Sequence, residues 1–163
     1  MLRVHSKKMN IDIKEIIGSH LEVVKSLDDD LSLIEQICKK SLSTLKNSGK
    51  IILCGNGGSA SDSIHISSEI VGKFEKKRKA LASISLSTNP SHLTAIGNDF
   101  GFDYVFSRQI EAIGNKEDLL IAISTSGNSK NVINAIEAAN AIGLETIIFT
   151  GENGGLMNSF NCL

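Results

Sequence analysis

The sequence predicts an α/β protein with a parallel β-sheet covered by helices on both faces. Short, wholly apolar segments alternate with segments whose apolar residues recur at helical spacing, which is the pattern of right-handed βαβ units. The 163 residues, 41% of them hydrophobic, are enough for one domain with a substantial core. We therefore expect a single domain over residues 1–163, with a helical segment at 1–49 and an α/β core at 50–163.

Two helices are expected before the first strand. Apolar residues follow helical spacing over 13–24 and again over 34–45, and three aspartates interrupt the pattern between them. The remaining elements follow in alternation. Strands are expected at 51–54, 81–86, 119–123 and 146–149, and helices at 59–74, 102–113 and 132–142.

Charge and cysteine content exclude several classes of function. With 17 basic and 18 acidic residues the net charge is −1, which gives no general attraction to nucleic acid or to an anionic membrane. The three cysteines lack a Cys-x-x-Cys pairing and fit a reducing compartment. No apolar run is long enough for a signal-peptide core or a membrane span, so we expect a cytoplasmic location. The basic run at 73–79 is interpreted as a solvated helix end, with steering of an anionic substrate as a second interpretation.

A glycine-rich turn, GNGGSA at 55–60, directly follows the first expected strand. Its glycines let backbone amides approach a ligand, and the helix start that follows favours an anion. The same letters fit the dinucleotide fingerprint G-x-G-x-x-A, but that site also needs an acidic residue ending the second strand, and SLST stands there. A tight turn without a ligand explains one or two glycines better than three glycines plus Asn56.

A hydroxyl-rich turn, STSGNS at 124–129, follows the third expected strand. Its hydroxyls, together with free amide N–H groups at a helix start, can hold a phosphate without a lysine. Ordinary helix capping needs only one such residue. The turn is therefore interpreted as a phosphate site, and the missing Walker lysine disfavours a P-loop.

Two further pairs of polar residues are candidates. His65 and Glu69 are four residues apart on one helix face, a spacing that suits two metal ligands or a base with its partner, although most such pairs are solvated. Asn98 and Asp99 lie in an expected loop after the second strand. They are interpreted either as ligands of sugar hydroxyls or as a turn with the cap of the next helix.

Taken in order, these motifs resemble those of the sugar isomerase (SIS) superfamily and, within it, the isomerases of seven-carbon sugar phosphates. The motifs are CGNGGSA, HxxxE, GNDFGF, FSRQIEA, ISTSGNS and TGENGG, and the similarity runs from about residue 11 to residue 157. The resemblance implies a three-layer αβα sandwich with a flavodoxin-like parallel sheet, preceded by two N-terminal helices. It also implies a homotetramer with active sites at subunit contacts.

Functional residues carry over from the superfamily by motif. The implied substrate contacts are Asn56, Gly57, Gly58, Glu69, Asn98, Asp99, Ser124, Thr125, Ser126 and Ser129. His65 and Glu69 match both zinc ligands and catalytic residues, with Glu69 as the base. Lys73 stands where many relatives have arginine, which would weaken a bidentate contact.

The resemblance implies an aldose–ketose isomerase. Its reaction would interconvert D-sedoheptulose 7-phosphate and D-glycero-D-manno-heptose 7-phosphate through an enediolate, in heptose biosynthesis for lipopolysaccharide or capsule. The chemistry needs a base near one carbon and an acid or metal to stabilise the oxyanion, and a zinc ion would polarise the carbonyl.

One departure from the superfamily bears on activity. Its members continue past TGENGG with a strand and a long helix, which carries a glutamine and a histidine that complete the zinc site. This chain ends at Leu163, before the positions of that glutamine and that histidine. We therefore expect a fragment or a truncated copy with an incomplete zinc site.

Two non-enzymatic alternatives remain open. The first is a sugar-phosphate-binding scaffold resembling the DnaA initiator-associating protein, which Gly58 and Ser126 oppose. The second is a sensor domain of the kind fused to a DNA-binding module, and no helix-turn-helix pattern precedes residue 50.

Overall fold

The computed structural model describes residues 12–151 and 153–163, in two compact units. The first unit extends to Glu35 and the second comprises Gln36–Leu163. The helical segment was expected to begin at residue 1, and its first eleven residues lie outside the described part. The division into one domain with a boundary near residue 50 stays a prediction.

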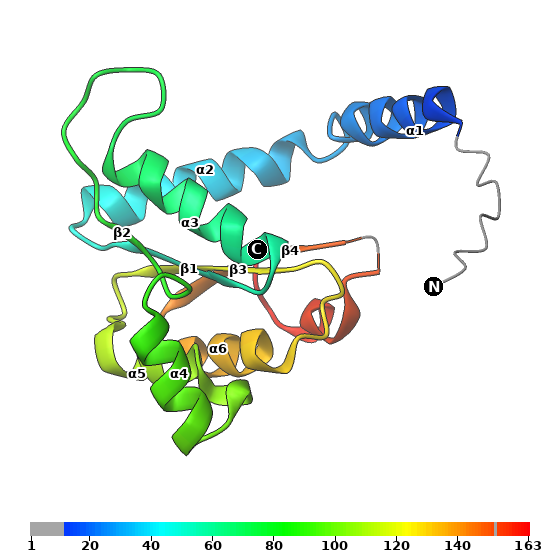
Figure 1. Cartoon of the computed structure of the whole chain (residues 1–163). Helices are drawn as coiled ribbons and strands as arrows, with labels where there is room; N and C mark the ends of the chain where they lie inside the picture. The colour runs from blue at the N-terminus through cyan, green and yellow to red at the C-terminus, as the bar shows by residue number, and fades with distance from the viewer. Residues whose placement is uncertain (1–11, 152) are drawn as a thin grey trace, which may run out of the picture. The chain divides into compact units, whose positions relative to one another are not determined.

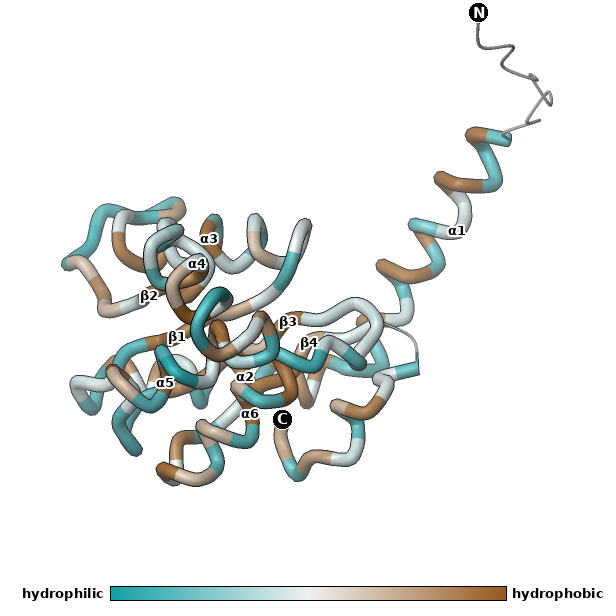
Figure 2. Tube along the Cα trace, turned by 60° about the horizontal axis from the view of Figure 1, so that its bottom comes forward, coloured by the Kyte–Doolittle hydropathy of each residue, from teal (hydrophilic) through white to brown (hydrophobic). Residues whose placement is uncertain are grey.

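The first unit contains helix α1 (Ile13–Ser26) and the first turn of α2 (Leu31–Lys46), which confirms the two expected helices. The Asp12 carboxylate caps α1 by accepting hydrogen bonds from the amides of Lys14 and Glu15. No residue of α1 is buried, although hydrophobic and hydrophilic positions alternate along it (Figure 2). Its apolar side chains thus lack the burial that an amphipathic helix normally provides.

The second unit is built on a parallel sheet with the strand order β2-β1-β3-β4 (Figure 1). The strands are β1 (Ile51–Gly55), β2 (Ser83–Ser85), β3 (Leu119–Ser124) and β4 (Glu145–Thr150). The order is flavodoxin-like, with β1 and β3 in the centre. This confirms the expected fold class.

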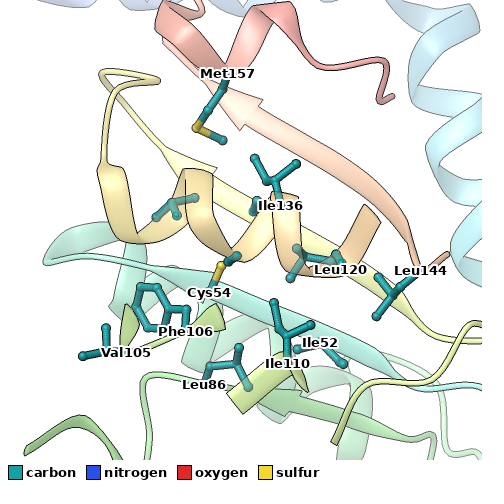
Figure 3. Close-up of a cluster of buried hydrophobic side chains, with 14 residues drawn as sticks. Ile52, Cys54, Leu86, Val105, Phe106, Ile110, Leu120, Ile136, Leu144 and Met157 are labelled. Atoms are coloured by element: carbon teal, nitrogen blue, oxygen red, sulfur yellow. The ribbon is translucent and has the colours of Figure 1, made fainter. Parts of the chain in front are cut away.

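Alternate residues of each strand pack on opposite faces of the sheet. On one face, Ile51 and Leu53 pack with Ile70 of α3 (Gly58–Val71) and with Ile37 of α2. On the other, Ile52 and Cys54 join a larger buried cluster (Figure 3) that includes side chains from α5 (Ser107–Ile113) and α6 (Lys130–Ala141). Burial on both faces explains why the two central strands, β1 and β3, are almost wholly apolar.

Several boundaries differ from the sequence-based expectation. Helix α3 ends at Val71 rather than Phe74, because Gly72 terminates it, and β2 is shorter than the predicted strand. The predicted helix at 102–113 is divided into a 3-10 turn, η1 (Phe102–Tyr104), and α5. A second 3-10 turn, η2 (Gly155–Ser159), follows β4.

One helix, α4 (Pro90–Asp99), was not predicted from the sequence. Asn89 caps it through the amides of Ser91 and His92, and Pro90 occupies its first turn. Apart from proline, only three of its residues have apolar side chains, so the sequence shows little of the apolar repeat that marks a helix. Its signal was therefore the cap and not the hydrophobic pattern.

None of the described helices is both long enough and apolar enough to span a bilayer.

A buried carboxylate joins the amino-terminal ends of the two central strands. Asp118, which is 4% exposed, accepts hydrogen bonds from the backbone amides of Lys50 and Asn115 and from the Lys50 ammonium group. Burial opposes its ionisation, but these hydrogen bonds and the charge of Lys50 outweigh that effect and lower the pKa of Asp118 below its ordinary value. The charged form therefore stabilises the folded state.

Replacing Asp118 by asparagine is expected to lower the free energy of unfolding by about 2 kcal/mol at neutral pH, because the buried donors lose a charged acceptor. Since folding lowers this pKa, the wild-type contribution is present above the ordinary aspartate pKa of about 3.9 and is lost as the pH falls through the folded value. Urea titrations from pH 7 to pH 3 should show the two proteins converging in acid. The exposed neighbour Glu117→Gln serves as the control, and a constant difference across that range would contradict the assignment.

Candidate functional site

Two loops leave neighbouring strands at the same edge of the sheet. The glycine-rich loop leads from β1 into α3, and the hydroxyl-rich loop, residues 124–129, leads from β3 into α6. The strands pair in register up to Gly55 and Ile123, so both loops begin at the same level. The parallel sheet, in which β1 and β3 are adjacent, thus places two helix N-termini beside each other.

The glycine-rich loop makes a turn that larger residues would obstruct. Gly57 has φ +56°, and a Cβ atom on Gly55 would lie 2.8 Å from the backbone of Ser59. Gly57 is also the N-cap of α3 and supplies no side chain to the first amides of that helix. Those N–H groups have no acceptor within the helix and can bind an anion.

The hydroxyl-rich loop is held by its own side chains. The hydroxyl of Ser124 donates to that of Ser129 over 3.0 Å, and the Ser126 hydroxyl accepts from the amide of Asn128 over 3.2 Å. Thr125 and Ser126 are exposed, whereas Ser124 is buried. The loop therefore presents two hydroxyl side chains to solvent at the start of α6.

The η2 segment donates hydrogen bonds to this loop and supports it. The amide of Leu156 donates to Asn128 Oδ1 over 2.9 Å, and the amide of Met157 donates to the Gly127 carbonyl over 3.0 Å. Gly127 has φ +63°, and a Cβ atom there would overlap the carbonyl oxygen of Gly154. Residues 154–157 thus act as a structural support for the loop.

An amide pair joins the two loops. Asn56 Nδ2 donates to Asn131 Oδ1 over 2.8 Å, and Asn131 Nδ2 donates back to Asn56 Oδ1 over 2.9 Å. Asn131 is 3% exposed and lies in the first turn of α6. The pair fixes the separation of the two helix N-termini, and it occupies the Asn56 amide that was predicted to touch the substrate.

The lysine that follows the hydroxyl-rich loop is already paired with an acidic residue. Lys130, at the start of α6, forms an ion pair with Asp103 over 3.0 Å, and the hydrogen bond and charge of Asp103 raise the pKa of Lys130. The two loops therefore offer backbone N–H groups, hydroxyls and helix dipoles to an anion. We call this region the cradle, defined by Asn56, Gly57, Gly58, Ser124, Thr125, Ser126 and Ser129.

His65 and Glu69 lie together on α3, beyond the cradle. His65 Nε2 is 3.5 Å from Glu69 Oε1, and the side chains are 76% and 37% exposed. Among residues 12–151 and 153–163, no three His, Cys, Asp or Glu side chains are grouped as a metal site would require. Two ligands do not satisfy the four-coordinate geometry of zinc, so the residues present do not fit a complete zinc site.

The expectation that Asn98 and Asp99 lie in a loop after the second strand is wrong. Both residues belong to the last turn of α4, where Asn98 Nδ2 donates to Asp99 Oδ1 over 2.7 Å. The capping alternative is also wrong, because Gly101 precedes η1. Figure 1 shows α4 leading away from the sheet. Asp99 instead lines a cavity of about 470 Å³ with His92 and Arg108.

Asn131 is the site residue that sequence reasoning missed. The predicted phosphate turn ended at residue 129 and the predicted helix began at residue 132, so Asn131 was assigned to neither, whereas α6 begins at Lys130. An amide in the first turn of a helix that follows a hydroxyl-rich loop was the available signal.

The substitution Asn131→Ala is expected to destabilise the protein by about 1–3 kcal/mol, because it leaves the Asn56 amide without its partner. It should also weaken binding of inorganic phosphate at the cradle, which calorimetry can measure. Asn134→Ala, on the next turn of α6, is the control, since its amide donates to the Asp103 carbonyl and not to the cradle. Equal effects of the two substitutions on phosphate binding would contradict a role for the amide pair.

Comparisons with known proteins agree with this architecture. The SIS domain family model matches residues 15–151. A protein named phosphoheptose isomerase from Helicobacter pylori (strain P12) is 50% identical over 144 residues, which are 88% of this chain and 75% of that protein. Its namesake from Aliarcobacter butzleri is 49% identical over 146 residues, covering 90% of this chain and 77% of its own length.

Solved structures give the same result. Phosphoheptose isomerase from Neisseria gonorrhoeae superposes with a TM-score of 0.78 at 40% identity, covering 91% of this chain and 80% of its own. The phosphoheptose isomerase structure from Francisella tularensis has a TM-score of 0.81 at 34% identity. The match covers 93% of this chain and 82% of that chain. Family model, sequence identity and strand order thus coincide over most of the chain, which belongs to the SIS domain family and, within it, to the phosphoheptose isomerases.

Proposed function

We propose that this chain is an isomerase that interconverts D-sedoheptulose 7-phosphate and D-glycero-D-manno-heptose 7-phosphate. The observation that carries the proposal is the cradle, in which hydroxyls and two helix N-termini converge at one edge of the sheet. The names of its relatives supply the substrate class.

The cradle would hold the phosphate group. Backbone N–H groups at Gly57 and Gly58 and the hydroxyls at 124–129 would donate to its oxygens, with the two helix dipoles favouring its charge. Asn98 and Asp99 would bind sugar hydroxyls.

The carboxylate of Glu69 is the proposed base. It would take a proton from C1, beside the C2 carbonyl, and return it to C2, while the proton of the C1 hydroxyl is transferred to the C2 oxygen. The ketose thus becomes the aldose through the enediolate with no net gain or loss of protons. His65, 3.5 Å from this carboxylate, would donate a hydrogen bond to the developing oxyanion.

The length of α3 bears on how the site is assembled. Glu69 lies about 16 Å further along the helix axis than Gly58, at a rise of 1.5 Å per residue. From its ketone carbon to its phosphorus, an extended heptulose phosphate spans roughly 9 Å, judged from the advance per bond of an extended chain. We therefore propose that Glu69 serves the cradle of a second subunit.

A homotetramer would provide this arrangement. The apolar stripe of α1 supports the proposal, since its side chains are exposed in the single chain and need a partner surface. The stripe comprises Ile13, Ile17, Leu21 and Val24, which are 67%, 55%, 52% and 48% exposed.

A zinc ion in this site would have two ligands from this chain. His65 and Glu69 would supply two nitrogen or oxygen atoms, and further ligands would come from elsewhere in the assembly. When bound, zinc would polarise the substrate carbonyl. The proton transfer above does not require it.

The cellular setting is proposed from the resemblance alone. The product would enter heptose biosynthesis for lipopolysaccharide or capsule, in the cytoplasm. Loss of heptose from the cell-surface polysaccharide of a deletion strain would support this setting, and unchanged polysaccharide would contradict it.

Glu69→Gln is expected to lower kcat by roughly 10²–10⁴-fold, because the amide cannot accept the proton, while binding of sedoheptulose 7-phosphate persists. Turnover is measured by formation of the aldose. Unchanged turnover would remove Glu69 from the mechanism, and binding without turnover in the wild type would favour a scaffold. Zinc content of the same two preparations reports whether the pair holds metal.

Mixing two inactive proteins tests the shared site. Ser129→Asp places a negative charge in the cradle and should abolish phosphate binding. Oligomers formed from Glu69→Gln and Ser129→Asp subunits should recover part of the activity, because some sites receive an intact base and an intact cradle. Absence of recovery in verified mixed oligomers would place both groups on one chain.

Ile17→Lys is expected to dissociate the oligomer, because a charge in an apolar interface costs several kcal/mol. Sedimentation should show smaller species with lost turnover. Glu22→Lys, on the opposite face of α1, is the control and should leave the mass unchanged. An Ile17→Lys protein of unchanged mass would contradict this use of the stripe.

A further inference from the structure

The segment after α3 concentrates positive charge that the proposed chemistry has not used. Residues 73–79 include five cations and one glutamate, in a chain whose net charge is −1. We call this segment the basic loop; its cations are Lys73, Lys76, Lys77, Arg78 and Lys79. Every residue from 71 to 80 is exposed, and Figure 1 shows the connection between α3 and β2 projecting from the second unit.

These cations are not neutralised by neighbours. In the described part of the chain, no ion pair involves a cation of the basic loop, whereas Lys40, Lys50, Lys116 and Lys130 are each paired with a carboxylate. A group of unpaired charges within seven residues creates a positive potential that reaches about 8–10 Å at physiological or lower ionic strength.

Arg78 fastens the loop to the end of α3 that carries Glu69. Its Nη2 atom donates to the carbonyl oxygen of Glu69 over 2.7 Å, and its Nη1 atom donates to that of Lys79 over 3.0 Å. The loop therefore folds back on the last turn of α3. Its charges lie beside the turn that presents the proposed base, at the opposite end of the helix from the cradle of the same chain.

We propose that the basic loop attracts the anionic sugar phosphate by long-range electrostatics and raises its rate of capture at the site to which Glu69 contributes. This inference rests on the proposed function. The loop acts before the chemistry: it raises the local concentration of a doubly charged ligand without touching the reacting carbons. The basic loop should therefore raise kcat/KM, and the increase should shrink as the salt concentration rises. The value of kcat should not change.

The test removes two charges and keeps the Arg78 anchor. For the wild type, kcat/KM with sedoheptulose 7-phosphate should fall as ionic strength rises from 20 mM to 300 mM. The K76Q/K77Q variant should show kcat/KM lowered by roughly fivefold or more at 20 mM, a flatter salt dependence and an unchanged kcat.

The K40Q/K116Q variant is the matched control. It changes the net charge by the same amount, but both lysines already form ion pairs, with Glu145 and Glu117. It should retain the salt dependence of the wild type. Equal slopes for K76Q/K77Q and the wild type, or equal losses in both variants, would overturn the proposal.

Failure of the proposed function gives a different result. In that case the wild type shows no turnover at any ionic strength, and the same salt series is read by calorimetric binding of sedoheptulose 7-phosphate. A dissociation constant that depends on salt in the wild type and not in K76Q/K77Q supports the basic loop as an attractor. A dissociation constant with the same salt dependence in both proteins overturns it.

Discussion

The amide pair between Asn56 and Asn131 sets the geometry on which the candidate site depends. It joins a loop after β1 to the first turn of α6, which is 75 residues further along the chain. Each amide donates one hydrogen bond to the other and accepts one from it, so the pair ties the two helix N-termini together without a charged group. An anion bound there meets donors that are already oriented, which lowers the cost of organising the site.

The direction of α3 places the proposed base, Glu69, far from the cradle of the same chain. The helix starts beside the cradle and runs back along the sheet, as helices do in βαβ units. Glu69 and the basic loop are consequently carried away from the cradle of their own chain. In the proposed shared site, a base and a positive loop from one subunit would reach the cradle of another, and the exposed stripe of α1 would hold the subunits together.

Sequence reasoning predicted the elements with strong apolar signals and missed those defined by polar contacts. The strands at β1 and β3 and the helices α2 and α6 were expected within a few residues of their observed bounds. Helix α4 was missed because a cap and a proline define it, and Asn98 and Asp99 were misplaced as a result. The site roles of His65 and Glu69 stay predictions, since their spacing alone fits many solvated helix faces.

The sequence by itself determined that a glycine-rich loop and a hydroxyl-rich loop each join a strand to a helix, because hydrophobic periodicity and glycine placement are local properties. It also determined the family, through motifs in a fixed order. Only the tertiary structure decided which loops are neighbours, that Asn131 holds Asn56, and that Arg78 ties the basic loop to Glu69. These contacts join residues from different elements, and strand order and helix direction, which set their distances, are not encoded in any single segment.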